Sequence, residues 1–211
     1  MPEILKIDDE TSEEIILTRA AQIIARGGVI AYPTETIYGL GVDATNEIAI
    51  RKIFEIKGRN FHNPISLIID REENIHPLVY DVPATARKLI TAFWPGALTI
   101  VFFSSNKVSS LLTADSGKIA VRVPGHKGAR MIAQKLAKPI TSTSANRSGA
   151  PECTESSEVF LQLGDSIDAI IDMGNTPGTK GSTIIDVTCI PPVILREGII
   201  TREMIRKCID I

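Results

Sequence analysis

Two cations close together follow a predicted helix in the first third of the chain. Lys57 and Arg59 flank Gly58, just after the amphipathic segment 46–56. If the chain is extended past Gly58, both side chains point to the same side. Such a pair suits a polyphosphate, because arginine offers a planar fork and lysine a compact point charge. The alternative is a solvated helix end, where lysine and arginine are common.

A polar run near residue 144 offers hydroxyl and amide groups. Ser144 and Asn146 follow an apolar strand, and residues two apart face the same side of an extended chain. The alternative is a capping or turn cluster, because Ser, Thr and Asn favour those places. Ser182, just before the apolar run IIDV, is open to the same two interpretations.

Two arginines lie in otherwise apolar predicted strands. Arg122 alternates with Val121 and Val123, and Arg196 ends the run 193–196. A charge in a central strand must be paired or face a cavity, because burying an unpaired charge is costly. The alternative for each is an edge strand with the arginine facing water. The sequence leaves both arrangements open.

Several common catalytic signatures are missing from the sequence. The three histidines have no metal-ligand spacing, and no P-loop, GxGxxG turn or GxSxG elbow occurs. A triad hydrolase is therefore poorly supported. We expect no metal held by protein side chains alone.

The composition suits a globular α/β protein. With 44% hydrophobic residues, the 211-residue chain can bury the core of one domain over residues 1–211. The net charge of −2 gives no overall electrostatic signature of nucleic-acid binding. No apolar run reaches the roughly 18 residues of a membrane span. Three scattered cysteines and an acidic N-terminus predict a protein of the cytoplasm.

The order of predicted elements indicates how these residues are positioned. Helices are expected to end at Ala25, after an N-cap at Thr11 or Ser12, and to cover 46–56, 83–93, 128–137, 155–163 and 202–208. Strands are expected at 29–32, 65–69, 97–103, 118–123, 167–171, 183–187 and 193–196, with a loop at 34–41. Some strands follow one another without a helix. We therefore expect a twisted mixed β-sheet with flanking helices.

Eight short motifs occur in order along nearly the whole chain. They are AYPTETIYGLG at 31–41, KGR at 57–59, NP at 63–64, WPGALT at 94–99, AVRVP at 120–124, SAN at 144–146, STIID at 182–186 and LREG at 195–198. Together they resemble the YrdC/TsaC family of threonylcarbamoyl-adenylate synthases, in its short form. Each motif is weak alone, but the ordered set is specific and favours the ligand-binding interpretation of each pair above. The resemblance implies a YrdC-like fold with a large concave cavity.

The resemblance also implies a reaction. L-Threonine takes up bicarbonate or CO2 on its amine, and the resulting carbamate attacks the α-phosphate of ATP. The products are threonylcarbamoyl-AMP and pyrophosphate, and Mg²⁺ accompanies the ATP. A separate TsaD-type transferase then uses threonylcarbamoyl-AMP to modify the adenosine beside the anticodon in tRNAs that read ANN codons. A direct contact with tRNA or other RNA is left open.

The resemblance further implies the roles of individual residues. It assigns the catalytic tetrad to Lys57, Arg59, Ser144 and Asn146. It assigns ATP binding to Lys57, Arg59, Asn63, Lys118, Ser144 and Arg196, and threonine binding to Thr36, Arg122, Ser142 and Ser182. No protein nucleophile is needed, because positioning and charge neutralisation do the work. Removing either cation of the KGR motif is then expected to lower turnover and leave the fold intact.

Three positions depart from the family pattern. Ile68 stands where the family often has a histidine that contacts threonine, Lys118 replaces a frequent threonine, and Glu152 replaces a frequent serine. These departures affect the expected amino-acid specificity and the contacts to the nucleotide, while the tetrad is intact.

Two other functions fit the same resemblance. One is an RNA-binding module of this fold, against which the nearly neutral composition argues. The other is a carbamoyl-transferring relative, such as the YrdC-like domain of hydrogenase maturation factors.

Overall fold

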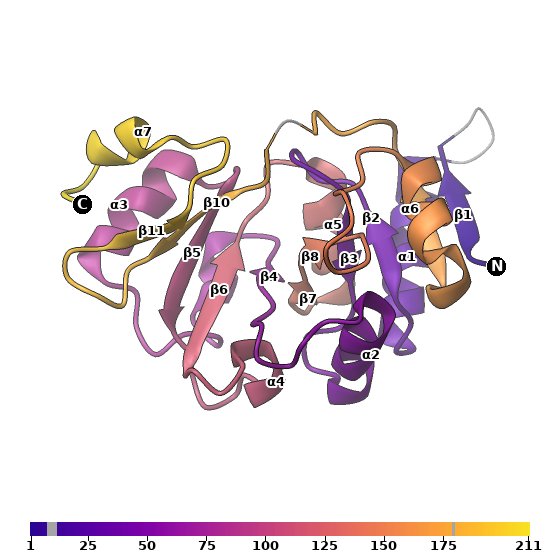
Figure 1. Cartoon of the computed structure of the whole chain (residues 1–211), viewed down its shortest axis with the longest axis horizontal. Helices are drawn as coiled ribbons and strands as arrows, with labels where there is room; N and C mark the ends of the chain where they lie inside the picture. Colours follow the sequence, from indigo (N-terminus) through magenta and orange to yellow (C-terminus); the bar gives the residue numbers. More distant parts are fainter. Residues whose placement is uncertain (8–11, 179) are drawn as a thin grey trace.

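Two mixed β-sheets lie side by side along the long axis of the molecule (Figure 1). The computed structural model describes residues 1–7, 12–178 and 180–211. In spatial order, one sheet contains β1 (Glu3–Lys6), β9 (Ala169–Asp172), β2 (Ile30–Tyr32), β3 (Gly39–Gly41) and β8 (Thr143–Ser144). The other contains β11 (Val193–Arg196), β10 (Thr183–Asp186), β5 (Leu98–Phe103), β6 (Lys118–Arg122), β4 (Leu67–Ile68) and β7 (Ile140–Thr141).

The predicted α/β class and mixed strand pairing are confirmed. β10 pairs in parallel with β5, whereas β5 and β6 are antiparallel. The strands are divided between two sheets, where the sequence had suggested one. Part of the expected loop 34–41 is also a strand, because β3 pairs with both β2 and β8.

The helices lie close to the positions expected from the sequence. They are α1 (Glu13–Ala25), α2 (Glu47–Lys57), α3 (Ala84–Phe93), α4 (Ser110–Thr113), α5 (Lys127–Leu136), α6 (Ser156–Leu163) and α7 (Arg202–Arg206), with short 3₁₀ turns at Glu72–Ile75 and Gly164–Ser166. Ser12 caps α1, and Thr11, the other expected cap, lies outside the described residues. In the described part of the chain, none of the helices combines the length and apolar character needed to cross a membrane.

The ends of α2 place the cationic turn. The side chain of Asn46 accepts a hydrogen bond from the amide of Ala49 and caps the helix at its start. Gly58 follows the last helical residue with φ 58° and ψ 36°, in the left-handed region that favours glycine. The chain therefore turns sharply between Lys57 and Arg59 instead of continuing extended.

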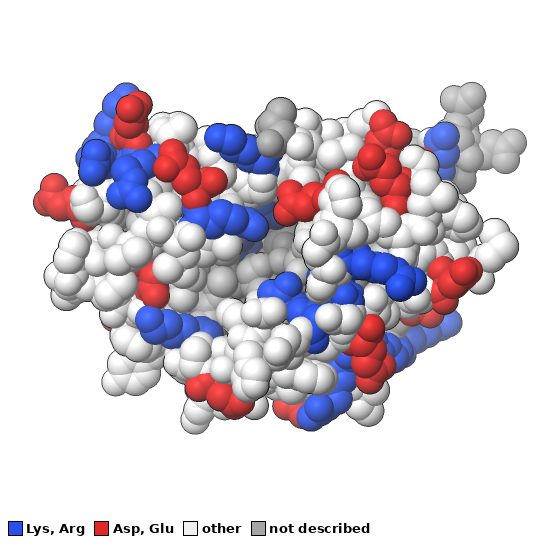
Figure 2. Space-filling view, viewed as in Figure 1, with Lys and Arg blue, Asp and Glu red and all other residues white. Residues whose placement is uncertain are grey.

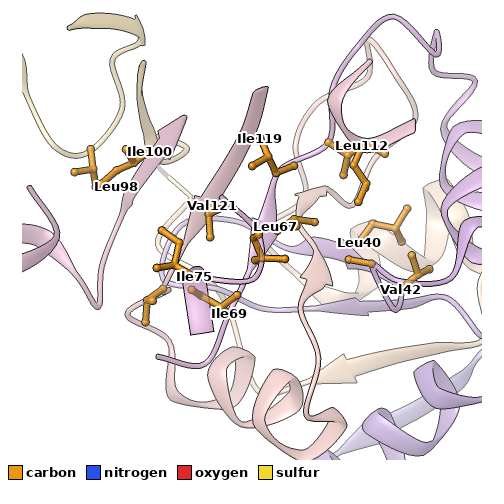
Figure 3. Packing of buried hydrophobic residues seen from close by; sticks show 14 of the residues in the cluster. Leu40, Val42, Leu67, Ile69, Ile75, Leu98, Ile100, Leu112, Ile119 and Val121 are labelled. Atoms are coloured by element: carbon orange, nitrogen blue, oxygen red, sulfur yellow. The ribbon is translucent and has the colours of Figure 1, made fainter. Parts of the chain in front are cut away.

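One large hydrophobic cluster joins the two sheets. It includes Leu40 and Val42 near β3, Leu67 of β4 and Val121 of β6, all buried (Figure 3). A second cluster packs α1 and α5 against β2 and β9 of the five-stranded sheet and also includes Ile68 of β4 and Ile140 of β7. Because the first cluster contains residues of both sheets, burial of apolar surface fixes how the sheets sit against each other.

The chain passes from one sheet to the other at Ser142, between β7 and β8. The amide of Ser142 donates to the Ser66 carbonyl oxygen at 2.7 Å, and the Ser66 hydroxyl donates back to the Ser142 carbonyl oxygen at 2.5 Å. This reciprocal pair fixes the crossing point. The polar run that begins here is therefore held where the two sheets meet.

Candidate functional site

A cavity of about 280 Å³ lies over one face of the six-stranded sheet. Its floor comes from residues two apart along three neighbouring strands: Thr99 and Val101 of β5, Ala120 and Arg122 of β6, and Ile184 of β10 with Ser182, which directly precedes β10. Since side chains alternate across a strand, each pair faces the same side. Figure 2 shows lysine and arginine side chains around the hollow at the centre of this face.

The loop between β2 and β3 forms part of the cavity wall. The hydroxyl of Thr34 donates to the Ile37 carbonyl oxygen at 2.7 Å and accepts hydrogen bonds from the amides of Thr36 and Ile37. The hydroxyls of Thr34 and Thr36 are 2.8 Å apart. These bonds fix the turn and hold the Thr36 side chain at the cavity.

Arg122 is buried, paired and directed at the cavity, so the edge-strand alternative does not apply to it. The residue is 4% exposed, and its Nη1 lies 3.4 Å from Oε1 of Glu35. Burial alone would raise the pKa of Glu35. The charge of Arg122 and nearby backbone N–H groups outweigh burial and lower the pKa. The pair is therefore ionic at neutral pH.

Arg196 lies over the far side of the floor, on the edge strand β11. Its Nε and Nη2 donate to the carbonyl oxygen of Ser182, and Nη2 also donates to the Ser182 hydroxyl at 3.2 Å. Gly198 lets β11 approach this closely, since a Cβ there would lie 2.0 Å from the Gly181 carbonyl oxygen. Arg196 and Ser182 therefore reach the cavity as one hydrogen-bonded unit.

Arg59 reaches the cavity from the segment after α2. Its Nε donates to the carbonyl oxygen of Asn63 at 3.2 Å, and its Nη2 donates to that of Pro64 at 2.9 Å. Asn63 is exposed and is absent from the cavity wall, so what it contributes is its backbone oxygen. The two carbonyls hold the guanidinium of Arg59 in place.

Lys57 lies behind the cavity wall instead of on it. Its residue surface is 3% exposed, and its Nζ donates to the carbonyl oxygens of Ser144 and Asn146 at 2.5 and 2.6 Å. A third hydrogen bond of 3.0 Å goes to Oδ1 of Asn146. Burial, with a smaller effect from the charge of Arg59, lowers the pKa of Lys57 to about 8. All three N–H donors of the ammonium are used within the protein.

Asn146 is turned into the protein as well. It is 6% exposed, accepts from Lys57 through Oδ1 and donates through Nδ2 to the Ala150 carbonyl oxygen at 2.6 Å. The amide of Ser148 in turn donates to the Lys57 carbonyl oxygen at 2.9 Å. The cationic turn and the SAN motif are thus bonded to each other, and Ser144 is the member of the motif that lines the cavity.

The structure brings most of the sequence-predicted site residues to one cavity. Its lining includes Thr36, Arg59, Arg122, Ser142, Ser144, Ser182 and Arg196. The predicted residues outside the lining are Lys57, Asn63, Lys118 and Asn146. Lys118 forms an ion pair of 2.9 Å with Asp186, and its predicted contact with the nucleotide stays a prediction.

Sequence reasoning missed several lining residues. Thr99 ends the WPGALT motif and shares a hydrogen bond of 2.9 Å with Ser182, and Ser66 follows the NP motif. The signal that could have found Thr99 is its hydroxyl side chain within the otherwise apolar predicted strand 97–103. Ile68, considered for its position in the family pattern, is fully buried in the second hydrophobic cluster.

The cavity is cationic and contains one acidic side chain. Three arginines line it, and among the described lining residues Glu152 supplies the one carboxylate. No ion pair of Glu152 is present in the described part of the chain, where no group of three His, Cys, Asp or Glu suited to a metal occurs either. The arginines suit an anionic ligand, and the serine and threonine hydroxyls can bind its polar groups. If the ligand brings a cation, Glu152 is the one carboxylate among the described lining residues that could coordinate it.

Comparisons with known proteins identify relatives of this chain. The chain is 40% identical to a threonylcarbamoyl-AMP synthase of Pyrococcus abyssi, over 95% of this chain and 59% of the relative. A Vibrio parahaemolyticus protein of the same name is 39% identical, over 83% of this chain and 95% of the relative. The crystal structure of P. abyssi Sua5 complexed with L-threonine superposes with a TM-score of 0.93 and 37% identity, covering 99% of this chain and 61% of that one.

The chain spans about three-fifths of the length of the archaeal relative. A family model for Sua5, YciO and YrdC proteins, described as telomere recombination, matches residues 22–198. The ordered motifs, the two-sheet fold and this match together show that the chain belongs to the Sua5/YciO/YrdC family.

Proposed function

We propose that this protein is an L-threonylcarbamoyladenylate synthase. It would convert L-threonine, bicarbonate or CO2 and ATP into threonylcarbamoyl-AMP and pyrophosphate, for the formation of N6-threonylcarbamoyladenosine in tRNA. The observation that carries the proposal is the single cavity in which Arg59, Arg122 and Arg196 surround serine and threonine hydroxyls. Relatives of 39–40% identity that bear the name of this enzyme support it.

The threonine subsite is proposed around Arg122. A guanidinium can bind a carboxylate through two parallel hydrogen bonds, and the guanidinium of Arg122 makes no hydrogen bond to the described protein. Thr36, Ser142 and Ser182 line the same cavity and offer hydroxyl groups to a small polar amino acid. A relative of this chain has been crystallised with L-threonine, which supports the choice of ligand.

The nucleotide subsite is proposed around Arg59, Arg196 and Ser144. The two arginines neutralise phosphate charge, and the hydroxyl of Ser144 adds a neutral donor. The floor beside them carries apolar side chains, namely Val101, Ala120, Ile184 and Leu195, which suit a nucleobase. Lys57 lies behind the cavity wall and supports this subsite by donating hydrogen bonds to the Ser144 and Asn146 carbonyl oxygens.

The chemistry follows from positioning. The neutral amine of threonine adds to CO2 and loses a proton to solvent, which gives a carbamate, and a carbamate oxygen then bonds to the α-phosphorus of ATP. The bond from that phosphorus to the β-phosphate bridging oxygen breaks, and pyrophosphate leaves with the electron pair. The protein holds the two substrates in line and stabilises charge on the phosphates, so that no protein nucleophile is required.

Mg²⁺ is proposed to enter with ATP. It prefers oxygen ligands and is usually held by one or two carboxylates together with substrate phosphates. Glu152 fits this role, because it lines the cavity and has no ion-pair partner among the described residues. When bound, the ion would offset the negative charge of the triphosphate.

Replacing Glu152 by serine is expected to weaken the dependence of nucleotide affinity on Mg²⁺. Without Mg²⁺, the variant should bind a non-hydrolysable ATP analogue about threefold more tightly, since a repelling carboxylate is gone. With Mg²⁺, this advantage should shrink or reverse. Calorimetry at two Mg²⁺ concentrations measures both affinities, and Glu55→Ser, an exposed change on α2, is the control. An unchanged ratio of the two affinities would contradict the role of Glu152.

The overall reaction is tested by its substrate requirements. Pyrophosphate release is expected only when L-threonine, bicarbonate, ATP and Mg²⁺ are all present. Omitting each component in turn, in a coupled phosphate assay with added pyrophosphatase, gives a direct readout. Release that is indifferent to L-threonine would defeat the proposal.

The product would pass to a separate TsaD-type transferase, and we propose the cytoplasm as the place of both steps. An RNA-binding function alone is less well supported, because the net charge of −2 gives no overall electrostatic signature of nucleic-acid binding. A salt-dependent shift of tRNA in a gel, with no ATP chemistry, would favour that alternative.

A further inference from the structure

A carboxylate lies directly behind the guanidinium of Arg122. Glu35 comes from the loop between β2 and β3, and its Oε1 is 3.4 Å from Nη1 of Arg122. Its Oε2 accepts a hydrogen bond of 3.2 Å from the amide of His126, in the turn between β6 and α5. Glu35 thus links a cavity loop to the segment that follows the strand of Arg122.

The surroundings of Glu35 show that it faces the arginine and not the ligand space. Glu35 is absent from the cavity lining, whereas its neighbours Thr34 and Thr36 are part of it. Its Oε1 is buried and makes no hydrogen bond in the described structure. A buried carboxylate oxygen without a hydrogen bond is costly and calls for an explanation. The 3.4 Å ion pair with Arg122 is the interaction that offsets this cost.

Arg122 depends on Glu35 in the same way. Its side chain is 5% exposed, and in residues 1–7, 12–178 and 180–211 Glu35 is its one ion-pair partner. No hydrogen bond ties the guanidinium to any other described group. Without Glu35, its direction would be set by packing alone, and a buried charge would be left unpaired.

We infer that Glu35 is a positioning residue that orients Arg122 toward the carboxylate of the amino-acid substrate. The inference rests on the proposed function, since it assumes that an amino-acid carboxylate binds Arg122. It adds that the affinity for this carboxylate depends on a side chain that does not touch the substrate. The pKa of Glu35 is lowered, which keeps the carboxylate charged at neutral pH and supports this role.

The test compares two ligands that differ at the carboxylate alone. Binding of L-threonine and of L-threoninamide is measured by calorimetry for the wild type, Glu35→Leu and Glu35→Gln. Glu35→Leu should weaken L-threonine binding about tenfold, as expected for a misdirected charge-assisted pair, and change L-threoninamide binding less than about twofold. Glu35→Gln should fall between the wild type and Glu35→Leu, because an amide oxygen can still accept from Arg122 and His126.

Each remaining outcome has a defined meaning. Equal losses for both ligands, or an unchanged affinity for L-threonine, would overturn the positioning role. If Glu35→Leu does not fold, Glu35→Gln decides by the same comparison of ligands. Glu3→Gln, which removes the half-exposed Glu3–Arg19 pair far from the cavity lining, is the control and should bind both ligands normally. A wild type that binds no L-threonine would instead refute the proposed function, and the inference with it.

Discussion

Replacing Lys57 by methionine is expected to lower the free energy of unfolding by about 2–4 kcal/mol, because two carbonyl oxygens and an amide oxygen that are at least partly buried lose their donor. These oxygens belong to Ser144 and Asn146, beside the proposed phosphate site. Turnover should fall as well, since the strand end that carries Ser144 loses its support. Urea unfolding followed by circular dichroism, together with pyrophosphate release, measures both effects.

Lys52→Met is a matched control for this prediction. Lys52 lies on the same helix, and its Nζ donates to one carbonyl oxygen, that of Gly27, at 2.8 Å. The control should lose no more than about 1 kcal/mol and keep its turnover. If Lys57→Met is as stable as the wild type but inactive, Lys57 acts on the substrate directly, as the sequence had suggested, and the supporting role is wrong.

Replacing Arg59 by alanine is expected to reduce pyrophosphate release about 100-fold or more, the usual cost of losing one preorganised donor to a charged transition state. Arg59 lines the cavity, and the groups it contacts are the exposed backbone carbonyls of Asn63 and Pro64, which water can satisfy in its absence. The melting temperature should therefore change little. Steady-state kinetics with varied ATP and thermal unfolding together separate the two effects.

The control for Arg59 is an exposed arginine outside the cavity. Arg71→Ala removes an exposed side chain whose ion pair is with its neighbour Asp70, and it should leave turnover unchanged. Full activity in Arg59→Ala would remove Arg59 from the mechanism. A large loss of stability would show that its contacts support the fold instead.

Local sequence signals predicted most of the helices well. Capping residues and glycines set the ends of α2, because Asn46 satisfies a free amide and Gly58 adopts a left-handed conformation. The division into two sheets was not predictable in this way. It depends on the pairing of short strands such as β3 and β8, whose two or three residues carry no alternation to read.

The sequence predicted which residues belong to the site, but it did not predict the direction in which each side chain points. Arg59 and Lys57 are two residues apart, yet one lines the cavity and the other lies behind it. The reason is the turn at Gly58, which breaks the alternation that an extended chain would have. The position of Lys118 in the motif predicted a contact with the nucleotide. In the structure its ammonium forms an ion pair with Asp186, which is 68 residues away in the sequence.

The central claim is that one cavity brings threonine, bicarbonate and ATP together, and product identification tests it most directly. The protein is incubated with ¹³C-labelled bicarbonate, ATP and Mg²⁺, with L-threonine or other amino acids, and the products are analysed by mass spectrometry. We expect threonylcarbamoyl-AMP that carries the labelled carbon, formed with L-threonine and lost in Arg59→Ala and Arg122→Ala. Pyrophosphate formed without any labelled adenylate would contradict it.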